Sequence, residues 1–198
     1  MNRAFFLISV AVATVVLASC GNAETGSRRP MAGRYQGMSA TPVRTEHNSQ
    51  DVMFAQMMIP HHRQAVVMAD EAATRASSPQ VKSLAAKIEN AQQPQIDTMT
   101  GWLQAWGEPT RPPRGMHMAE GMMSEQDMKN LESLSGRPFD RMFLQMMIKH
   151  HQGAISMAET EKEQGADPDA KALAASIISS QSTEIAKMRS LLKRMGPE

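Results

Sequence analysis

An internal repeat limits what this chain can fold into. Residues 51–107 align with residues 140–196 without a gap, at an offset of 89 positions, and 23 of the 57 aligned pairs are identical. Such self-similarity indicates a domain made of two copies of one structural unit. Each copy contains two helical patterns separated by Ser78-Pro79 or Asp167-Pro168, and proline is tolerated in a first helical turn that Ser or Asp caps. The sequence therefore predicts an all-α four-helix bundle made of two duplicated helical hairpins.

The first 20 residues have the features of an export signal. A positive charge at Arg3 precedes an apolar run over residues 4–16, and small residues precede Cys20. The ending Leu-Ala-Ser-Cys resembles the bacterial lipoprotein signal, in which the cysteine is lipidated; an ordinary secretory signal is the alternative. We expect an exported protein, lipid-anchored to the cell envelope on its periplasmic or extracellular face. Because Cys20 is the only cysteine, disulfides and cysteine-based zinc sites are excluded.

The remaining chain divides into a tether and the duplicated bundle. Residues 21–48 are rich in Gly, Ser, Thr, Arg and Pro and lack apolar periodicity, which predicts a flexible tether. The bundle is expected over residues 49–198, with repeat 1 at 51–107, a connector at 108–139 and repeat 2 at 140–196. Within the connector, Ser124 can cap a short helix through about Ser135. The connector is long enough to leave the bundle topology open.

The charge balance excludes one class of partner. The 21 basic and 20 acidic residues are spread along the chain and leave a formal net charge of +1. No basic patch of the kind that binds nucleic acid is therefore expected.

The first helix of each copy carries a regular stripe. Its members recur at alternating steps of three and four residues, the spacing of a buried face in a helical bundle. One histidine of each pair, His61 or His150, falls on this stripe and should point inward. The next residue, His62 or His151, is turned by about 100° and should lie at the flank of the stripe. The stripe consists of Asp51, Phe54, Met58, His61, Ala65, Met68 and Ala72 in the first copy and of Asp140, Phe143, Met147, His150, Ala154 and Met157 in the second.

The second helix of each copy also has an apolar face. A single glutamine interrupts this face, Gln92 in the first copy and Gln181 in the second. A buried amide needs hydrogen-bond partners, and an inward histidine is a suitable one. The faces consist of Leu84, Ile88, Gln92, Ile96, Met99, Leu103 and Trp106, and of Leu173, Ile177, Gln181, Ile185, Met188, Leu192 and Met195.

Methionine is unusually abundant, with 19 residues against eight aromatic ones. A methionine stripe is commonly core packing, and a lone inward histidine is commonly a hydrogen-bonded core residue. Two histidine pairs, each flanked by methionines at matched positions, favour metal ligation, and thioether with imidazole suits Cu(I) and by extension Ag(I). The candidate ligands are His61, His62, Met57, Met58 and Met68 in the first copy and His150, His151, Met146, Met147 and Met157 in the second.

The connector adds a second candidate site for a soft metal. Its segment MHMAEGMM spans residues 116–123, and closely spaced methionines in a flexible segment can wrap a soft ion. A methionine-rich loop without a ligand is the alternative. The candidate ligands here are Met116, His117, Met118, Met122 and Met123.

Carboxylate-based metal chemistry has less support. Ferritin-like di-iron bundles place Glu three residues before a ligand histidine, where this chain has Met58 and Met147. Asp51 and Asp140 stand about 15 Å along the helix from the histidines, although an antiparallel neighbour can bring a carboxylate closer. A ferritin-like di-metal oxidase stays an alternative, as does a structural or interaction bundle without metal.

These motifs resemble a known family. Met57-Met58-Ile59-x-His61-His62-x-x-Ala65-x-x-Met68-Ala69, its second copy over residues 146–158, and Gly121-Met122-Met123-Ser124 are similar to the family catalogued as domain of unknown function 305, which includes CopM-like periplasmic copper-binding proteins. The resemblance covers about residues 48–196. It implies a ferritin-like four-helix bundle and, for members with an assigned role, Cu(I) and Ag(I) binding in copper tolerance by the two histidine pairs and neighbouring methionines.

We therefore expect a lipid-anchored, extracytoplasmic protein that binds Cu(I) or Ag(I). It would sequester the ion or pass it, as a metallochaperone, to a copper-transfer protein, and no catalysis is required. Lys149 stands where the first copy has Pro60, so the two sites should differ in affinity. Binding should weaken below about pH 6, because a ligating imidazole must be neutral and free histidine titrates near 6.5.

Overall fold

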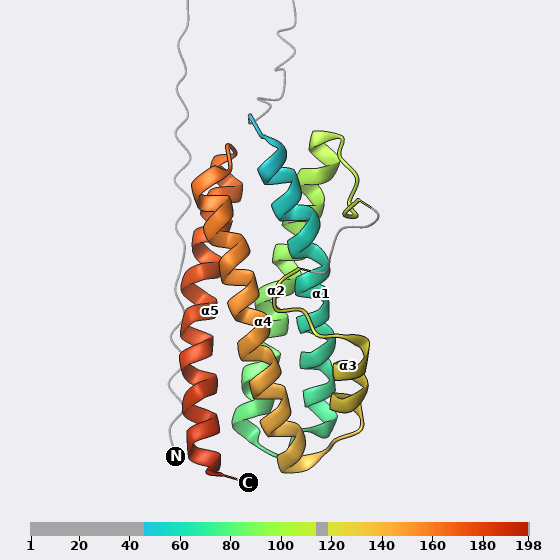
Figure 1. Cartoon of the computed structure of the whole chain (residues 1–198), viewed down its shortest axis with the longest axis vertical. Helices are drawn as coiled ribbons and strands as arrows, with labels where there is room; N and C mark the ends of the chain where they lie inside the picture. Colours follow the sequence, from blue (N-terminus) through green and yellow to red (C-terminus); the bar gives the residue numbers. More distant parts are fainter. Residues whose placement is uncertain (1–45, 114–118, 198) are drawn as a thin grey trace, which may run out of the picture. The chain divides into compact units, whose positions relative to one another are not determined.

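The fold is a bundle of two helical hairpins (Figure 1). The computed structural model describes residues 46–113 and 119–197, and every regular element in these ranges is a helix. The first hairpin consists of α1 (Ser49–Arg75) and α2 (Pro79–Trp106), and the second of α4 (Gly136–Gln164) and α5 (Pro168–Met195), with the short α3 (Glu125–Glu132) between them. The predicted all-α bundle of two hairpins is confirmed. None of the helices in these ranges combines the length and apolar character that a membrane crossing needs.

Several sequence predictions lie outside the described residues. The export signal, the lipidated Cys20 and the tether up to residue 45 fall there, as do Met116, His117 and Met118 of the connector. They stay predictions.

The hairpin turns form as the capping residues predict. The Ser78 side chain accepts a hydrogen bond from the backbone N–H of Val81, and the Asp167 carboxylate accepts two from the first turn of α5. A proline follows each cap, at the first position of α2 and of α5. Its missing N–H removes a donor that would have no helical partner at that position. Each turn is therefore short and is closed by the polar residue before the proline.

Two aspartates tie the hairpins together. The carboxylate of Asp51, near the start of α1, accepts backbone hydrogen bonds from residues 166–167, the turn of the second hairpin, at 3.0–3.1 Å. The carboxylate of Asp140, near the start of α4, accepts them from residues 77–78, the turn of the first hairpin, at 3.0–3.1 Å. The N-terminus of α1 therefore lies beside the turn that follows α4, and the N-terminus of α4 lies beside the turn that follows α1. The helices α1 and α4 consequently run antiparallel. This contact decides the topology that the connector length left open.

The core is arranged about the central pair of α1 and α4. The helix α2 packs on α1 and α5 packs on α4, whereas α2 and α5 touch each other little. Buried side chains form two apolar clusters, one containing Met58 and Ala154 and the other containing Met147 and Ala65. In each cluster a methionine of one central helix accompanies an alanine of the other, which leaves room for the long side chain between close backbones.

The connector packs along one side of the bundle. Ser124 and Asp127 form a capping box at the start of α3, as the sequence predicts. The helix ends at Glu132, three residues before the predicted end, because its last turn tightens and Leu134 packs against the core. Leu131 is fully buried there, so α3 covers part of the apolar core. The next helix, α4, begins at Gly136, four residues before the boundary of the repeat.

Candidate metal site

Four histidines lie together at the centre of the bundle. His61 and His62 of α1 and His150 and His151 of α4 are all fully buried. The ring centroids of His61 and His150 are 3.7 Å apart, with the rings tilted by 40°. These two side chains therefore point inward and meet at the contact between α1 and α4, as the stripe predicts.

The prediction that His62 and His151 lie at the flank of the stripe is wrong. Each is buried against the second helix of its own hairpin. The His62 Nε2 lies 2.8 Å from Oε1 of Gln95 on α2, and the His151 Nε2 lies 2.7 Å from Oε2 of Glu184 on α5. Both α1 and α4 pack against two neighbours, so each has two buried faces about 100° apart. Successive histidines therefore occupy successive buried faces.

Gln95 and Glu184 are site residues that the sequence interpretation missed. They occupy matched positions of the two repeats, 89 residues apart, and each is a polar residue three positions after an inward glutamine. That spacing was the available signal. The inward glutamines do not bond to the histidines as predicted: the amide atoms of Gln92 and the Oε1 of Gln181 are buried without a hydrogen-bond partner.

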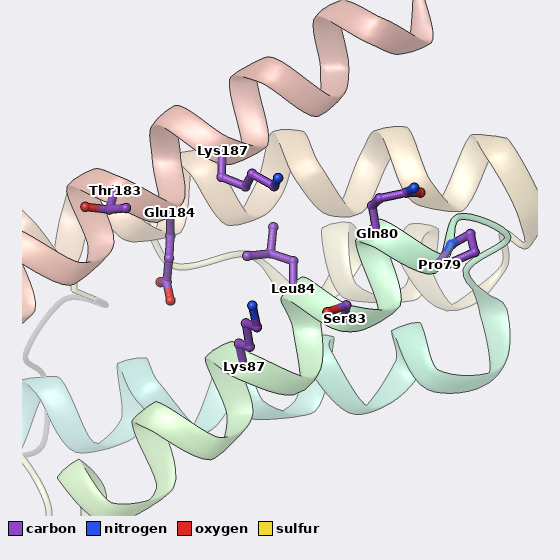
Figure 2. A pocket seen from close by; sticks show the side chains of 8 residues that line it. All are labelled: Pro79, Gln80, Ser83, Leu84, Lys87, Thr183, Glu184 and Lys187. Atoms are coloured by element: carbon purple, nitrogen blue, oxygen red, sulfur yellow. The ribbon is translucent and has the colours of Figure 1, made fainter.

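One of these partners is accessible from outside. A groove of about 440 Å³ runs between α2 and α5, and Glu184 points into it beside Lys87 and Lys187, with Leu84 at its floor (Figure 2). The Glu184 side chain is 20% exposed to solvent. The second histidine pair is therefore connected to the solvent through a carboxylate, whereas Gln95, the matched residue of the first copy, is neutral.

The hydrogen bonds determine which ring nitrogens are free. The His61 Nε2 donates to the backbone carbonyl of Glu120 at 3.1 Å, and a carbonyl or carboxylate oxygen can only accept. In a neutral imidazole that donates through Nε2, Nδ1 keeps its lone pair. Within residues 46–113 and 119–197, the Nδ1 atoms of His61, His62 and His151 are buried without a hydrogen-bond partner. In metal sites, a ligand histidine commonly donates its other ring N–H to an oxygen, which holds the ring in place and makes the free nitrogen a better ligand.

Burial keeps these imidazoles in the form that binds metals. It lowers the pKa of His61 to about 4 and the pKa of His62 to about 3. The pKa of His150 is also well below its usual value, because of burial and then of the neighbouring His61. A protonated imidazole has no lone pair to donate, so these three histidines are available as ligands well below neutral pH. The predicted weakening of binding below about pH 6, which assumed the pKa of free histidine, therefore does not hold for them.

The nitrogen and oxygen ligands alone do not form a ready-made site. In residues 46–113 and 119–197, no three side chains of His, Cys, Asp or Glu are placed so that they could hold a metal ion together. Asp51 and Asp140 are engaged at the ends of the bundle and do not approach the histidines. Met58 and Met147, one turn before the inward histidines, are fully buried.

The other predicted methionines fall into two groups. Met68, Met123 and Met146 are buried among core side chains. Met57, Met122 and Met157 are partly exposed, so Met157 departs from the predicted inward stripe, although its counterpart Met68 is fully buried. The connector contacts both positions in different ways. Its Met123 and Leu131 belong to the apolar cluster that contains Met68, whereas its Ala119 and Glu120 line an open hollow beside Met157.

Comparison with known proteins identifies the family. The family model described as domain of unknown function (DUF305) matches residues 51–192. The chain belongs to this family. No curated protein sequence matches it.

Solved structures of DUF305 proteins share the fold. A DUF305 protein from Streptomyces coelicolor is 34% identical, with a TM-score of 0.71 over 76% of this chain and 96% of that one. A DUF305 fragment from Deinococcus radiodurans is 34% identical, with a TM-score of 0.68 over 74% of this chain and 97% of that one. CopM in its Cu(I)-bound form is 34% identical, with a TM-score of 0.65 over 74% of this chain and 98% of that one. CopM has also been solved with Cu(II) and with Ag bound.

Proposed function

We propose that this DUF305 protein binds Cu(I) and Ag(I) through its central histidines and methionines, and sequesters the ion or passes it to a protein partner. The observation that carries the proposal is the set of buried imidazoles, of which His61, His62 and His151 each keep an Nδ1 lone pair without a hydrogen-bond partner among the described residues. An unpaired buried polar atom is costly, and three at the centre of one bundle indicate a function other than packing. The Cu(I)-, Cu(II)- and Ag-bound forms of CopM support the choice of metal.

The donor set suits a soft monovalent ion. His61 and His150 supply nitrogen at the contact of the central helices, and Met58 and Met147 supply thioether sulfur from the adjacent turns. Cu(I) and Ag(I) accept two or three such ligands, whereas Fe(II), Mn(II) and Mg(II) prefer oxygen. The described residues bring no carboxylate cluster to the histidines, which favours binding over di-metal oxidation. We therefore assign the protein no catalytic step.

Metal titration tests the proposal. The purified protein is titrated with Cu(I) against a competing chelator, beside a variant in which His61→Leu and His150→Leu remove two ligands at nearly constant volume. We expect the affinity of the variant to fall by at least about 100-fold, in the range that loss of metal-site residues produces. His47→Leu, which removes a histidine stacked on Trp106 away from the site, is the control and should bind normally. An unchanged affinity in the double variant, with helical content retained, would refute the ligand assignment.

The alternative is a structural bundle whose histidines and methionines only pack. In that case Cu(I) should not change the thermal stability of the protein, whereas a ligand that binds only the folded state raises it. The structural alternative also predicts that the double leucine variant is as stable as the parent, or more stable, without any loss of metal binding. The two measurements separate the hypotheses.

Export and lipid anchoring at Cys20 are part of the proposal. The lipoprotein-like ending of the first 20 residues supports them, and one neighbour, the Streptomyces coelicolor protein, is named as a secreted protein. Cys20→Ala should move the protein from the membrane fraction to the soluble extracytoplasmic fraction. A protein that stays in the cytoplasm with or without this change would contradict export.

A further inference from the structure

A second group of methionines lies at the surface of the bundle. A hollow of about 270 Å³ between α1 and α4 is lined by the side chains of Met53, Met57 and Met157, here called the open methionine cluster. Met53 is 44% exposed, which is unusual for so apolar a side chain. The rest of the lining is polar or small: Gln50, Ala119, Glu120 and Thr160. Three thioethers from two helices therefore face one solvent-accessible space.

The duplication provides an internal comparison for this cluster. The matched residues, 89 positions away, are Met142, Met146 and Met68, here called the covered methionine cluster. Met68 is fully buried, Met146 is 7% exposed, and Met142 packs against the core. Met123 and Leu131 of the connector belong to the same apolar cluster. The covered methionine cluster is therefore more buried than the open one, with Met68 and Met146 buried and Met142 partly buried.

Packing explains only part of the open methionine cluster, because Met157 lies against an apolar core cluster but Met53 is largely exposed. An exposed methionine contributes little burial and is susceptible to oxidation, whereas leucine would cover the same helix surface without that liability. Thioether sulfur does bind soft cations, and it binds hard cations poorly. Three methionine side chains that line a common space, next to the acidic residue Glu120, form a suitable site for a soft monovalent cation.

The hollow also adjoins the central histidines. Glu120 lines it, and the backbone carbonyl of the same residue accepts the hydrogen bond from His61. Ala119, another lining residue, is 8% exposed and packs beside it. The segment that separates the hollow from the buried imidazole is therefore only one residue thick.

We propose that Met53, Met57 and Met157 form an entry site that binds Cu(I) or Ag(I) at the surface before the ion reaches the central histidines. This inference rests on the proposed function and adds a second site of a different donor set. The covered methionine cluster serves only as packing. The entry site uses sulfur alone, so its affinity does not depend on the protonation of any histidine.

Methionine methyl spectra of the protein with Ag(I) test the inference. The protein carries 13C-labelled methionine methyl groups, and silver nitrate is added in sub-stoichiometric steps, because Ag(I) binds thioethers without redox chemistry. We expect the resonances of Met53, Met57 and Met157 to shift during the titration, in addition to those of Met58 and Met147. The resonances of the covered methionine cluster should not move.

Matched variants complete the test. In the open-cluster variant, Met53→Leu, Met57→Leu and Met157→Leu replace the thioethers by side chains of similar size, and chelator competition should then show one Ag(I) site fewer. In the control, Met142→Leu should leave the number of sites unchanged. The inference is overturned if the open-cluster variant keeps every site, or if the covered cluster shifts first. Binding at the histidines alone would overturn it and leave the proposed function intact, whereas no Ag(I) binding at all would overturn both.

Discussion

A buried carboxyl pair makes the stability of this bundle depend on pH. Glu161 of α4 is fully buried and lies against the carboxyl group of Asp51. Burial, and then the neighbouring Asp51, raises the pKa of Glu161 from 4.5 to about 8. Burial opposes ionisation of Asp51, but hydrogen bonds from Glu161 and from the backbone lower its pKa. Glu161 therefore holds the proton that lies between the two groups, and Asp51 carries the charge.

The raised pKa of Glu161 makes the folded protein less stable as the pH rises. The folded protein keeps a proton on Glu161 that the unfolded chain releases above pH 4.5, so the free energy of unfolding falls as the pH rises from 4.5 to about 8. The pH of 7 lies about 2.5 units above the pKa of Glu161 in the unfolded chain, which corresponds to about 3 kcal/mol of lost stability.

Glu161→Gln should remove this loss. Glutamine keeps the size of the side chain and can donate to the Asp51 carboxylate at every pH. We expect the variant to be more stable than the parent by about 3 kcal/mol at pH 7 and by little at pH 4.5. The assay is urea unfolding followed by circular dichroism at half-unit steps from pH 4.5 to pH 8, with the difference between the two proteins plotted against pH.

A matched control separates this effect from a general change of charge. Glu163→Gln removes the same charge from an exposed position of the same helix, and it should change stability by less than about 0.5 kcal/mol at any pH. A difference between Glu161→Gln and the parent that does not vary with pH would refute the reasoning, because only an uptake of protons on folding produces the slope.

Three further predictions concern other contacts. Gly153→Ala should lower the melting temperature by several degrees, because the new Cβ would come 1.9 Å from a carbonyl oxygen of the connector. Gly101→Ala, with open space around it, should be neutral or stabilising. Thermal circular dichroism checks both variants. Glu184→Gln should weaken Cu(I) binding up to about 100-fold and Gln95→Glu should strengthen it, because a carboxylate behind an imidazole increases its basicity as a ligand; equal affinities in chelator competition would contradict this. Asp140→Asn should cost about 1–3 kcal/mol in urea unfolding, because the turn it caps loses acceptors, and unchanged stability would show that water replaces the carboxylate.

The repeat and the helical periodicity were sufficient to predict the fold. The offset of 89 residues and the capped prolines predict two hairpins, and both are present. The alternating steps of three and four residues identify His61 and His150 as inward residues, and their rings meet. These features depend on the chain's local geometry, which is a property of each repeat and can be read from one sequence.

The second buried face could not be obtained in this way. Periodicity marks the face with the strongest apolar signal, and α1 has another face against α2, where His62 meets Gln95. A pair of polar residues does not add to the apolar periodicity of either helix. Its burial depends on how the two helices are aligned, which the periodicity of one helix does not show. The same holds for His151 and Glu184.

The difference in exposure between the two methionine clusters also could not be predicted from the sequence. The repeats match at each of these positions, so Met157 and Met68 have the same local pattern. Their exposure differs because the apolar connector residues Met123 and Leu131 pack in the cluster of Met68, whereas Ala119 and Glu120 of the connector only line an open hollow beside Met157. The path of a long connector depends on tertiary packing and not on the repeat itself.

Asp51 and Asp140 make the same contact in opposite directions, which is the arrangement of a symmetric dimer. A single hairpin carries both halves of this contact: the aspartate at the start of its first helix and the turn before its second. Two separate hairpins can therefore dock on each other as the two halves of this chain do. The protein is equivalent to a homodimer whose subunits have been joined by a linker. Because the linker occurs only once, it makes the two subunits unequal and allows one of them to specialise.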